Sequence, residues 1–214
     1  MHMSRRTPLP VKIGIGLLVL AGIGVLFIRS LDTSRAEPFL VRGEHLAPWT
    51  VAADAAATGE AAVVALAPPP ELPMRLFRQV FTRAGESLST PLRPGITLVT
   101  ADELRGVTVQ VDELVSMART AGLDRARLNP RCMGYRRDSK PGATRQVYFI
   151  VFDMPEFAAF RQAVAARAEA QGAPTFSAEG LSPVMLLAGQ PDVSGWMPIV
   201  VDADTDCVAP VAAE

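Results

Sequence analysis

The sequence has few of the side chains that carry out catalysis or hold metal ions. Histidine and cysteine each occur twice in 214 residues, and their spacing matches no zinc site. The Gly-x-Ser-x-Gly nucleophile motif, the phosphate-binding glycine loop and the dinucleotide-binding fingerprint are also missing. A lone histidine such as His45 is more typical of a structural hydrogen bond than of a general base. We therefore expect no cofactor and favour a binding function over catalysis.

The sequence also has no excess of charge of either sign. Lys and Arg number 21, Asp and Glu number 22, and the formal net charge is −1. An even mixture of charges creates no field that would concentrate nucleic acid at the surface, so we do not expect nucleic acid as a partner. Lysine occurs only at Lys12 and Lys140, whereas arginine, alanine and proline are abundant. This bias is typical of bacterial genomes rich in G and C.

One long apolar segment is present, near the N-terminus. Residues 13–28, IGIGLLVLAGIGVLFI, have no charged side chain and lie between Lys12 and Arg29. As a helix they would extend about 24 Å, slightly less than the ~30 Å hydrocarbon core, and the two flanking basic side chains can reach the interface. The pattern predicts a single-pass signal anchor. The alternative is a signal peptide cleaved near Ala36, although charged residues directly precede that site.

The basic residues beside this segment favour a cytoplasmic N-terminus. With 49% hydrophobic residues, the chain is long enough for one well-packed core. We therefore expect a bacterial inner-membrane protein with a cytoplasmic tail (1–12), a transmembrane anchor (13–28), a tether (29–60) and one extracytoplasmic domain (61–214). Apolar residues in the tether should pack on the domain, and these are Phe39, Leu40, Leu46 and Trp49.

The remaining pattern predicts an α+β fold, with a single mixed, mostly antiparallel sheet and helices packed on it. Helical periodicity is found at 71–85, 112–122 and 153–172, each ending in glycine, and Asp153 is a good N-cap for the last helix. Apolar or alternating runs predict strands at 62–66, 95–100, 107–111, 146–153, 183–189 and 196–201.

Three aspartates at alternate positions, Asp202, Asp204 and Asp206, resemble a metal site. The spacing fails the calcium-loop test, because a cysteine replaces the required glycine at position six and the glutamate at position twelve is missing. It also fails the phosphatase pattern, which has threonine where this sequence has Asp206. We therefore interpret the three as the solvated end of a strand. The alternative is a weak metal site.

The two cysteines, Cys132 and Cys207, are candidates for a disulfide if the domain is extracytoplasmic. Such a bond would close a loop of about 75 residues and stabilise the fold by roughly 4 kcal/mol in the chain-entropy model. The alternative is two separate buried thiols.

A cluster of basic residues surrounds an expected hairpin. If they lie on one side of the domain, they could bind lipid headgroups, an anionic wall polymer or an acidic partner; otherwise they are simply solvated. The cluster consists of Arg131, Arg136, Arg137, Lys140 and Arg145. The helix expected at 71–85 is basic on one side as well, and could either pack on the sheet or lie in a membrane surface.

Together these observations predict a membrane-tethered extracytoplasmic binding or assembly module of a bacterial envelope complex, with a protein of the envelope as partner. One alternative is a small metal-dependent hydrolase in which the aspartates converge with other acidic residues, such as Asp153 or Glu156. The other is a lipid-binding or sensor domain, which would need an apolar cavity or an exposed apolar patch.

Overall fold

The structure is a computed structural model, and it describes residues 20, 22–24, 37–59, 61–140, 143–173, 176–190 and 200–214. The chain divides into two units, Met1–Glu37 and Pro38–Glu214. Most of the expected transmembrane anchor (13–28) lies outside the described residues. Among the residues that are described, no helix is both long and apolar enough to cross a bilayer.

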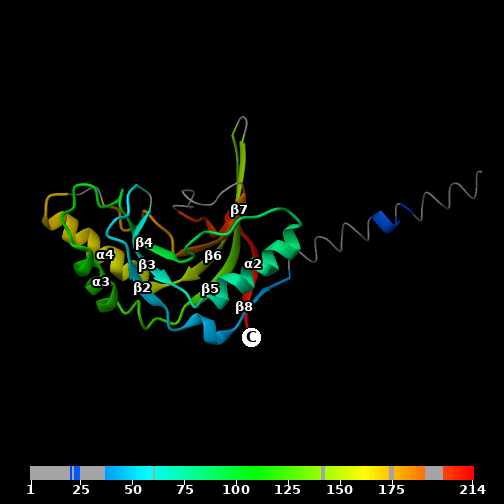
Figure 1. Cartoon of the computed structure of the whole chain (residues 1–214), viewed down its shortest axis with the longest axis horizontal. Helices are drawn as coiled ribbons and strands as arrows, with labels where there is room; N and C mark the ends of the chain where they lie inside the picture. The colour runs from blue at the N-terminus through cyan, green and yellow to red at the C-terminus, as the bar shows by residue number, and fades with distance from the viewer. Residues whose placement is uncertain are drawn as a thin grey trace, which may run out of the picture. The chain divides into compact units, whose positions relative to one another are not determined.

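The second unit contains one eight-stranded sheet in the order β1-β8-β5-β6-β7-β4-β3-β2 (Figure 1). Every neighbouring pair is antiparallel except β1 and β8, which are parallel. The strands are β1 (Phe39–Val41), β2 (Thr50–Ala53), β3 (Ala62–Ala67), β4 (Ile96–Thr100), β5 (Asn129–Lys140), β6 (Ala143–Asp153), β7 (Val184–Gln190) and β8 (Cys207–Ala213). The outer ends of β5 and β6 project from the sheet as a two-stranded arm (Figure 1).

Three helices, α2 (Glu71–Ala84), α3 (Val111–Thr120) and α4 (Pro155–Ala170), contribute to the main core, while α5 (Ala203–Asp206) is a single turn before β8. Strand alternation places Ile150 and Phe152 of β6 in this core and Val147, Phe149 and Val151 in a smaller cluster on the opposite face. The α+β class, with one mostly antiparallel sheet and helices on it, is therefore confirmed.

The segment expected as a strand at 107–111 is irregular, and α3 begins at Val111. The side-chain amide of Gln171 binds both backbone groups of Thr108, accepting from its N–H at 2.9 Å and donating to its carbonyl at 2.6 Å. The side chain of the residue that caps α4 thus supplies the hydrogen bonds that a neighbouring strand would otherwise make. The strand prediction was wrong here because the alternation reflects partial burial of Val107, Val109 and Val111 against the main core.

Asp153 is not the N-cap of α4. The cap is Met154, which makes no side-chain capping bond, and Pro155 occupies the first helical turn. Asp153 is instead the last residue of β6, and its carboxylate lies 3.8 Å from Arg131 on the neighbouring strand.

The domain extends further toward the N-terminus than the sequence suggested. Residues 38–59, expected as part of the tether, contain β1, a 3₁₀ turn (Gly43–Leu46) and β2, and three of the four expected apolar anchors are buried. Leu40 is the exception, because its side chain faces solvent. The Gln79 side chain of α2 binds the Leu40 backbone instead.

The C-terminal residues form an inner strand instead of a solvated tail. β8 pairs with β5 on one side and with β1 on the other. The strand expected at 196–201 falls mostly on residues 191–199, which lie outside the described part of the chain, and residues 200 and 201 are not in a strand.

Candidate functional site

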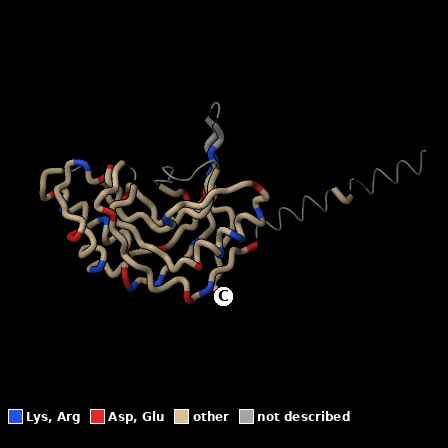
Figure 2. Tube along the Cα trace, in the orientation of Figure 1, with Lys and Arg blue, Asp and Glu red and all other residues tan. Residues whose placement is uncertain are grey.

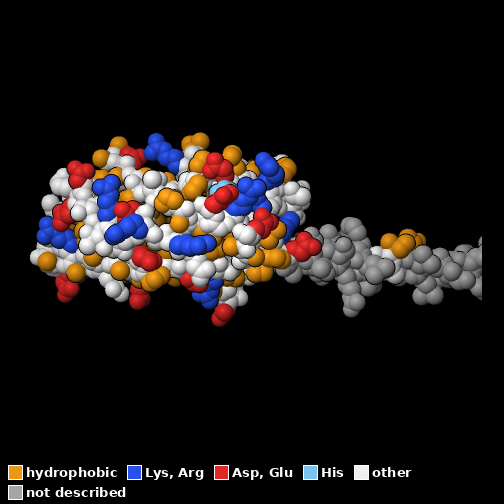
Figure 3. All heavy atoms as spheres, turned by 90° about the horizontal axis from the view of Figure 1, so that it is seen from below, with side chains coloured by type: hydrophobic (Ala, Val, Ile, Leu, Met, Phe, Trp, Pro, Cys, Tyr) orange, Lys and Arg blue, Asp and Glu red, His pale blue; other side chains and the backbone are white. Residues whose placement is uncertain are grey.

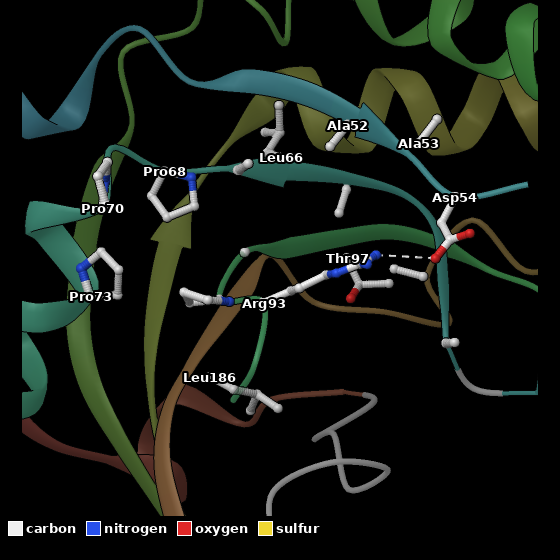
Figure 4. A pocket seen from close by; sticks show the side chains of 16 residues that line it. Ala52, Ala53, Asp54, Leu66, Pro68, Pro70, Pro73, Arg93, Thr97 and Leu186 are labelled. Atoms are coloured by element: carbon white, nitrogen blue, oxygen red, sulfur yellow. Dashed lines mark hydrogen bonds and ion pairs between the residues drawn. The ribbon is translucent and has the colours of Figure 1, made fainter. Parts of the chain in front are cut away.

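A groove of about 550 Å³ lies at the end of the sheet formed by β2, β3 and β4 (Figure 4). We call it the alanine groove, because small side chains of these strands make its floor. Thr97 lies between buried Ile96 and Leu98 of β4, so its side chain is on the face opposite the main core. The floor residues are Ala52, Ala62, Ala65, Ala67 and Thr97.

The groove is open because the described elements cover this face unevenly. Over β5, β6 and β7, Val201 and Cys207 pack against the smaller apolar cluster, which includes Leu186. Leu186 also lines the groove, at the border between the covered and the open part of the face. Among the described residues, none of the groups that pack on this smaller cluster extends over the three strands beyond Leu186.

Prolines form one wall of the groove. Pro68 and Pro70 end β3 and lead into α2, and Pro94 precedes β4. Next to Pro94, a Cβ on Gly95 would lie 2.6 Å from the carbonyl oxygen of Leu66. Only glycine permits this close approach of the two strands. Because proline has a fixed φ and no N–H, this wall is stiff and offers no backbone donors.

The charged groups at the groove bind each other. Arg93 extends along the floor, as Figure 4 shows, and its guanidinium lies 3.2 Å from the Asp54 carboxylate. Asp54 also accepts a hydrogen bond from the backbone N–H of Ala56 at 3.0 Å. The pair is largely exposed, so it contributes little to stability. It adds polarity at one end of an otherwise apolar site.

A second groove, of about 500 Å³, lies on the other face of the sheet, between α2 and the loop before β4. Its walls include Met74, Phe77, Arg78 and Phe81 of α2, together with Leu187. Leu187 belongs to the main core, whereas its neighbour Leu186 belongs to the opposite face. The two grooves thus lie on opposite faces and share three prolines, Pro70, Pro73 and Pro94.

The three C-terminal aspartates do not converge on a common point. Asp202 caps α5 by accepting the N–H of Asp204 at 3.0 Å, and Asp204 is exposed. Asp206 is buried and forms an ion pair with Arg136, whose Nε lies 3.1 Å from Oδ1. The expectation that all three are solvated is therefore wrong for Asp206. In the part of the chain that the structure describes, no three His, Cys, Asp or Glu residues are grouped so as to hold a metal ion.

The four basic candidates whose side chains the structure describes have different surroundings. Arg136 is paired with Asp206 and donates to the Val200 carbonyl at 3.1 Å, and Arg131 is near Asp153. Arg137 and Arg145 are exposed on the arm, and the side chain of Lys140 lies outside the described residues. Figures 2 and 3 show basic and acidic side chains intermixed along the described trace and on the face in view.

Cys132 and Cys207 are joined by a disulfide, with Cα atoms 5.7 Å apart. The bond connects β5 to the start of β8 within the smaller apolar cluster. It therefore fastens the inner strand β8 at the point where the chain leaves α5.

Sequence reasoning missed the most deeply buried charge. Arg161 is 0% exposed and donates to the Glu103 carboxylate at 2.6 Å. It also donates to the carbonyls of Leu98, Ser177 and Ala178 at 2.9, 2.5 and 2.8 Å. A signal was present, because Arg161 lies on the same helical stripe as the buried apolar residues of α4. With all its bonds inside the fold, this cluster is structural.

His45 is a further polar residue with a buried atom. Its Nδ1 is buried without a hydrogen-bond partner among the described residues, and Nε2 lies 3.7 Å from the exposed carboxylate of Glu44. Its backbone carbonyl accepts from the indole N–H of buried Trp49 at 3.0 Å. Glu71 of α2 lines the same pocket as His45.

Comparison of the chain with protein-family models, with curated proteins and with solved structures finds no match in any of the three. The site's geometry therefore carries the functional argument.

Proposed function

We propose that this protein is a membrane-tethered, extracytoplasmic binding module of a bacterial envelope complex, and that the alanine groove binds an extended segment of a partner protein. The observation that carries the proposal is an open, apolar groove whose charged residues neutralise each other. Such a surface can recognise a ligand but has no group positioned for acid–base or nucleophilic chemistry.

The extended shape of the ligand follows from the edges of the sheet. At β1 the edge is closed, because the Gln79 amide accepts from Leu40 N–H at 2.9 Å and donates to Leu40 C=O at 2.8 Å. No comparable side-chain amide binds β2 among the described residues. An unprotected edge strand can pair with an added strand. β2 also borders the alanine groove, so a strand added there would direct alternate side chains into it.

The floor selects the chemistry of these side chains. Alanine and threonine let a second backbone approach closely, whereas a charged side chain over the floor would lose hydration without gaining a partner. The partner segment should therefore carry small or medium apolar residues at every second position. A polar residue at one end would meet Arg93 and Asp54.

Photo-crosslinking of the full-length chain in its native membrane tests the proposal. A photoreactive residue is placed at Ala67, on the groove face of β3, and the crosslinked peptide of the partner is sequenced by mass spectrometry. We expect one partner segment with alternating apolar residues. Ala52→Trp, which fills the groove, should lower the yield about tenfold, corresponding to ~1.4 kcal/mol of lost binding.

The control variant is Ala55→Trp, on an exposed turn outside the groove, and it should leave the yield unchanged. A crosslink between two copies of this chain would show that the groove is a self-association surface. Equal yields with Ala52→Trp and Ala55→Trp would contradict binding in the groove.

A further inference from the structure

Helix α2 has two apolar stripes where packing on the sheet requires one. The first, formed by Leu72, Leu76 and Val80, is buried in the main core. The second is formed by Met74, Phe77 and Phe81, at the spacing of one helical face. Met74 is 58% exposed and Phe81 is 50% exposed. The main core accounts for the first stripe and for part of Phe77, which packs against it. Met74 and Phe81 remain exposed and need another apolar environment.

The loop beside α2 adds to this exposed surface. Leu92 is 95% exposed, and its neighbour Pro91 lines the same groove as Phe77 and Phe81. We call Met74, Phe77, Phe81 and Leu92 the outer apolar surface. A leucine held almost wholly in water at a loop tip, next to exposed aromatic rings, is typical of a surface that enters a lipid interface.

A basic residue borders this surface. Arg78 is exposed on α2, next to Met74 in helical projection, and it forms no ion pair with any described residue. By contrast, Arg75 on the next face is paired with Glu214 at 2.6 Å. An unpaired guanidinium among apolar side chains can bind a lipid phosphate while its neighbours reach the acyl boundary.

The tether holds this helix near the bilayer. The domain begins at Pro38, whose carbonyl accepts a hydrogen bond at 2.9 Å from Arg83 in the last turn of α2. Residues 29–37, between the expected anchor and this point, can extend at most about 30 Å. The outer apolar surface is thus confined to a thin layer above the membrane, where even weak affinity suffices for docking.

We infer that the outer face of α2 docks on the membrane surface through Met74, Phe77, Phe81 and Leu92, with Arg78 binding anionic headgroups; this rests on the tether proposed above. The alanine groove is on the opposite face of the sheet. Docking through α2 therefore directs the groove away from the lipid, toward a partner.

Fluorescence quenching by brominated lipids tests the docking. The full-length chain is reconstituted in nanodiscs of brominated phosphatidylcholine, with or without phosphatidylglycerol, and carries either Phe81→Trp or Ala52→Trp. We expect quenching of the added indole in Phe81→Trp, and none in Ala52→Trp, where the indole is on the groove face. Both variants keep the native tryptophans, so the parent chain supplies the background.

The contribution of Arg78 is measured in the Phe81→Trp background. Arg78→Gln should lower the ratio of docked to undocked chain about fivefold in nanodiscs with phosphatidylglycerol, the effect of one basic residue near an anionic surface. Arg137→Gln, an exposed arginine on the projecting arm, should change nothing.

The outcomes separate the two proposals. If the chain inserts into nanodiscs but the indole at position 81 is not quenched, docking through α2 is wrong and the tether stands. Stronger quenching at position 52 than at 81 would mean that the groove face contacts lipid instead. If the full-length chain does not enter nanodiscs at all, both the tether and the docking are wrong.

Discussion

The buried Arg161–Glu103 pair allows a quantitative test of the fold. Arg161→Met keeps much of the side-chain volume but removes the charge and every donor. Glu103 would lose the guanidinium at 2.6 Å, and the carbonyls of Leu98, Ser177 and Ala178 would each lose the hydrogen bond from Arg161. Removing one partner of a buried ion pair typically costs about 3–5 kcal/mol, which is a large fraction of the roughly 5–15 kcal/mol by which a typical domain is stable.

The matched control is on the same helix. Arg167 forms an ion pair with Glu113 at 3.0 Å, but its side chain is 46% exposed. Arg167→Met should therefore cost about 0–1 kcal/mol. Both variants preserve α4, since methionine and arginine have similar helix propensities.

Urea unfolding of the full-length chain in detergent, with the disulfide intact, measures both free energies of unfolding. Adding Glu103→Gln to Arg161→Met should recover part of the loss, because the unpaired buried charge is then removed. If Arg161→Met is no more destabilising than Arg167→Met, the conclusion that the Arg161–Glu103 cluster stabilises the fold is wrong.

Two further predictions concern the smaller apolar cluster. A Cβ at Gly134 would lie 2.2 Å from the ring of buried Phe149, so Gly134→Ala should lower the free energy of unfolding by about 1–3 kcal/mol through overpacking. Thermal unfolding measures this loss, and Phe149→Leu in the same background should recover part of the lost stability. A Gly134→Ala variant as stable as the parent chain would contradict this packing. The second prediction concerns the Cys132–Cys207 bond. A thiol assay under denaturing, non-reducing conditions should find no free thiol, whereas two free thiols per chain would refute the bond in solution. Reduction of the bond should lower the free energy of unfolding by about 4 kcal/mol.

The three main helices and four of the eight strands, β3, β4, β6 and β7, could be predicted from the sequence, because their signals are local. In α2, buried residues recur at helical spacing and Gly85 ends the helix with φ 65°, where glycine is favoured. β6 was predicted from a continuous apolar run, because it is covered on both faces, as its two sets of buried residues show.

Local patterns failed where a distant residue supplies the partner. The segment 107–111 alternates like a strand, but Gln171 binds its backbone, and this cannot be read from either stretch alone. Asp206 looked solvated because its partner, Arg136, is 70 residues away along the chain. Burial of a charge depends on whether the fold brings an opposite charge to it.

By itself, then, the sequence determined the α+β class, the approximate positions of the main helices and the scarcity of catalytic groups. It also predicted a membrane anchor in a segment that lies mostly outside the described residues. Only the tertiary structure decided that β2 is at an edge, that an alanine floor is left open beside it, and that α2 has a second apolar stripe facing solvent. The physical reason is that composition and periodicity fix which faces are apolar, whereas topology fixes which of those faces remain uncovered.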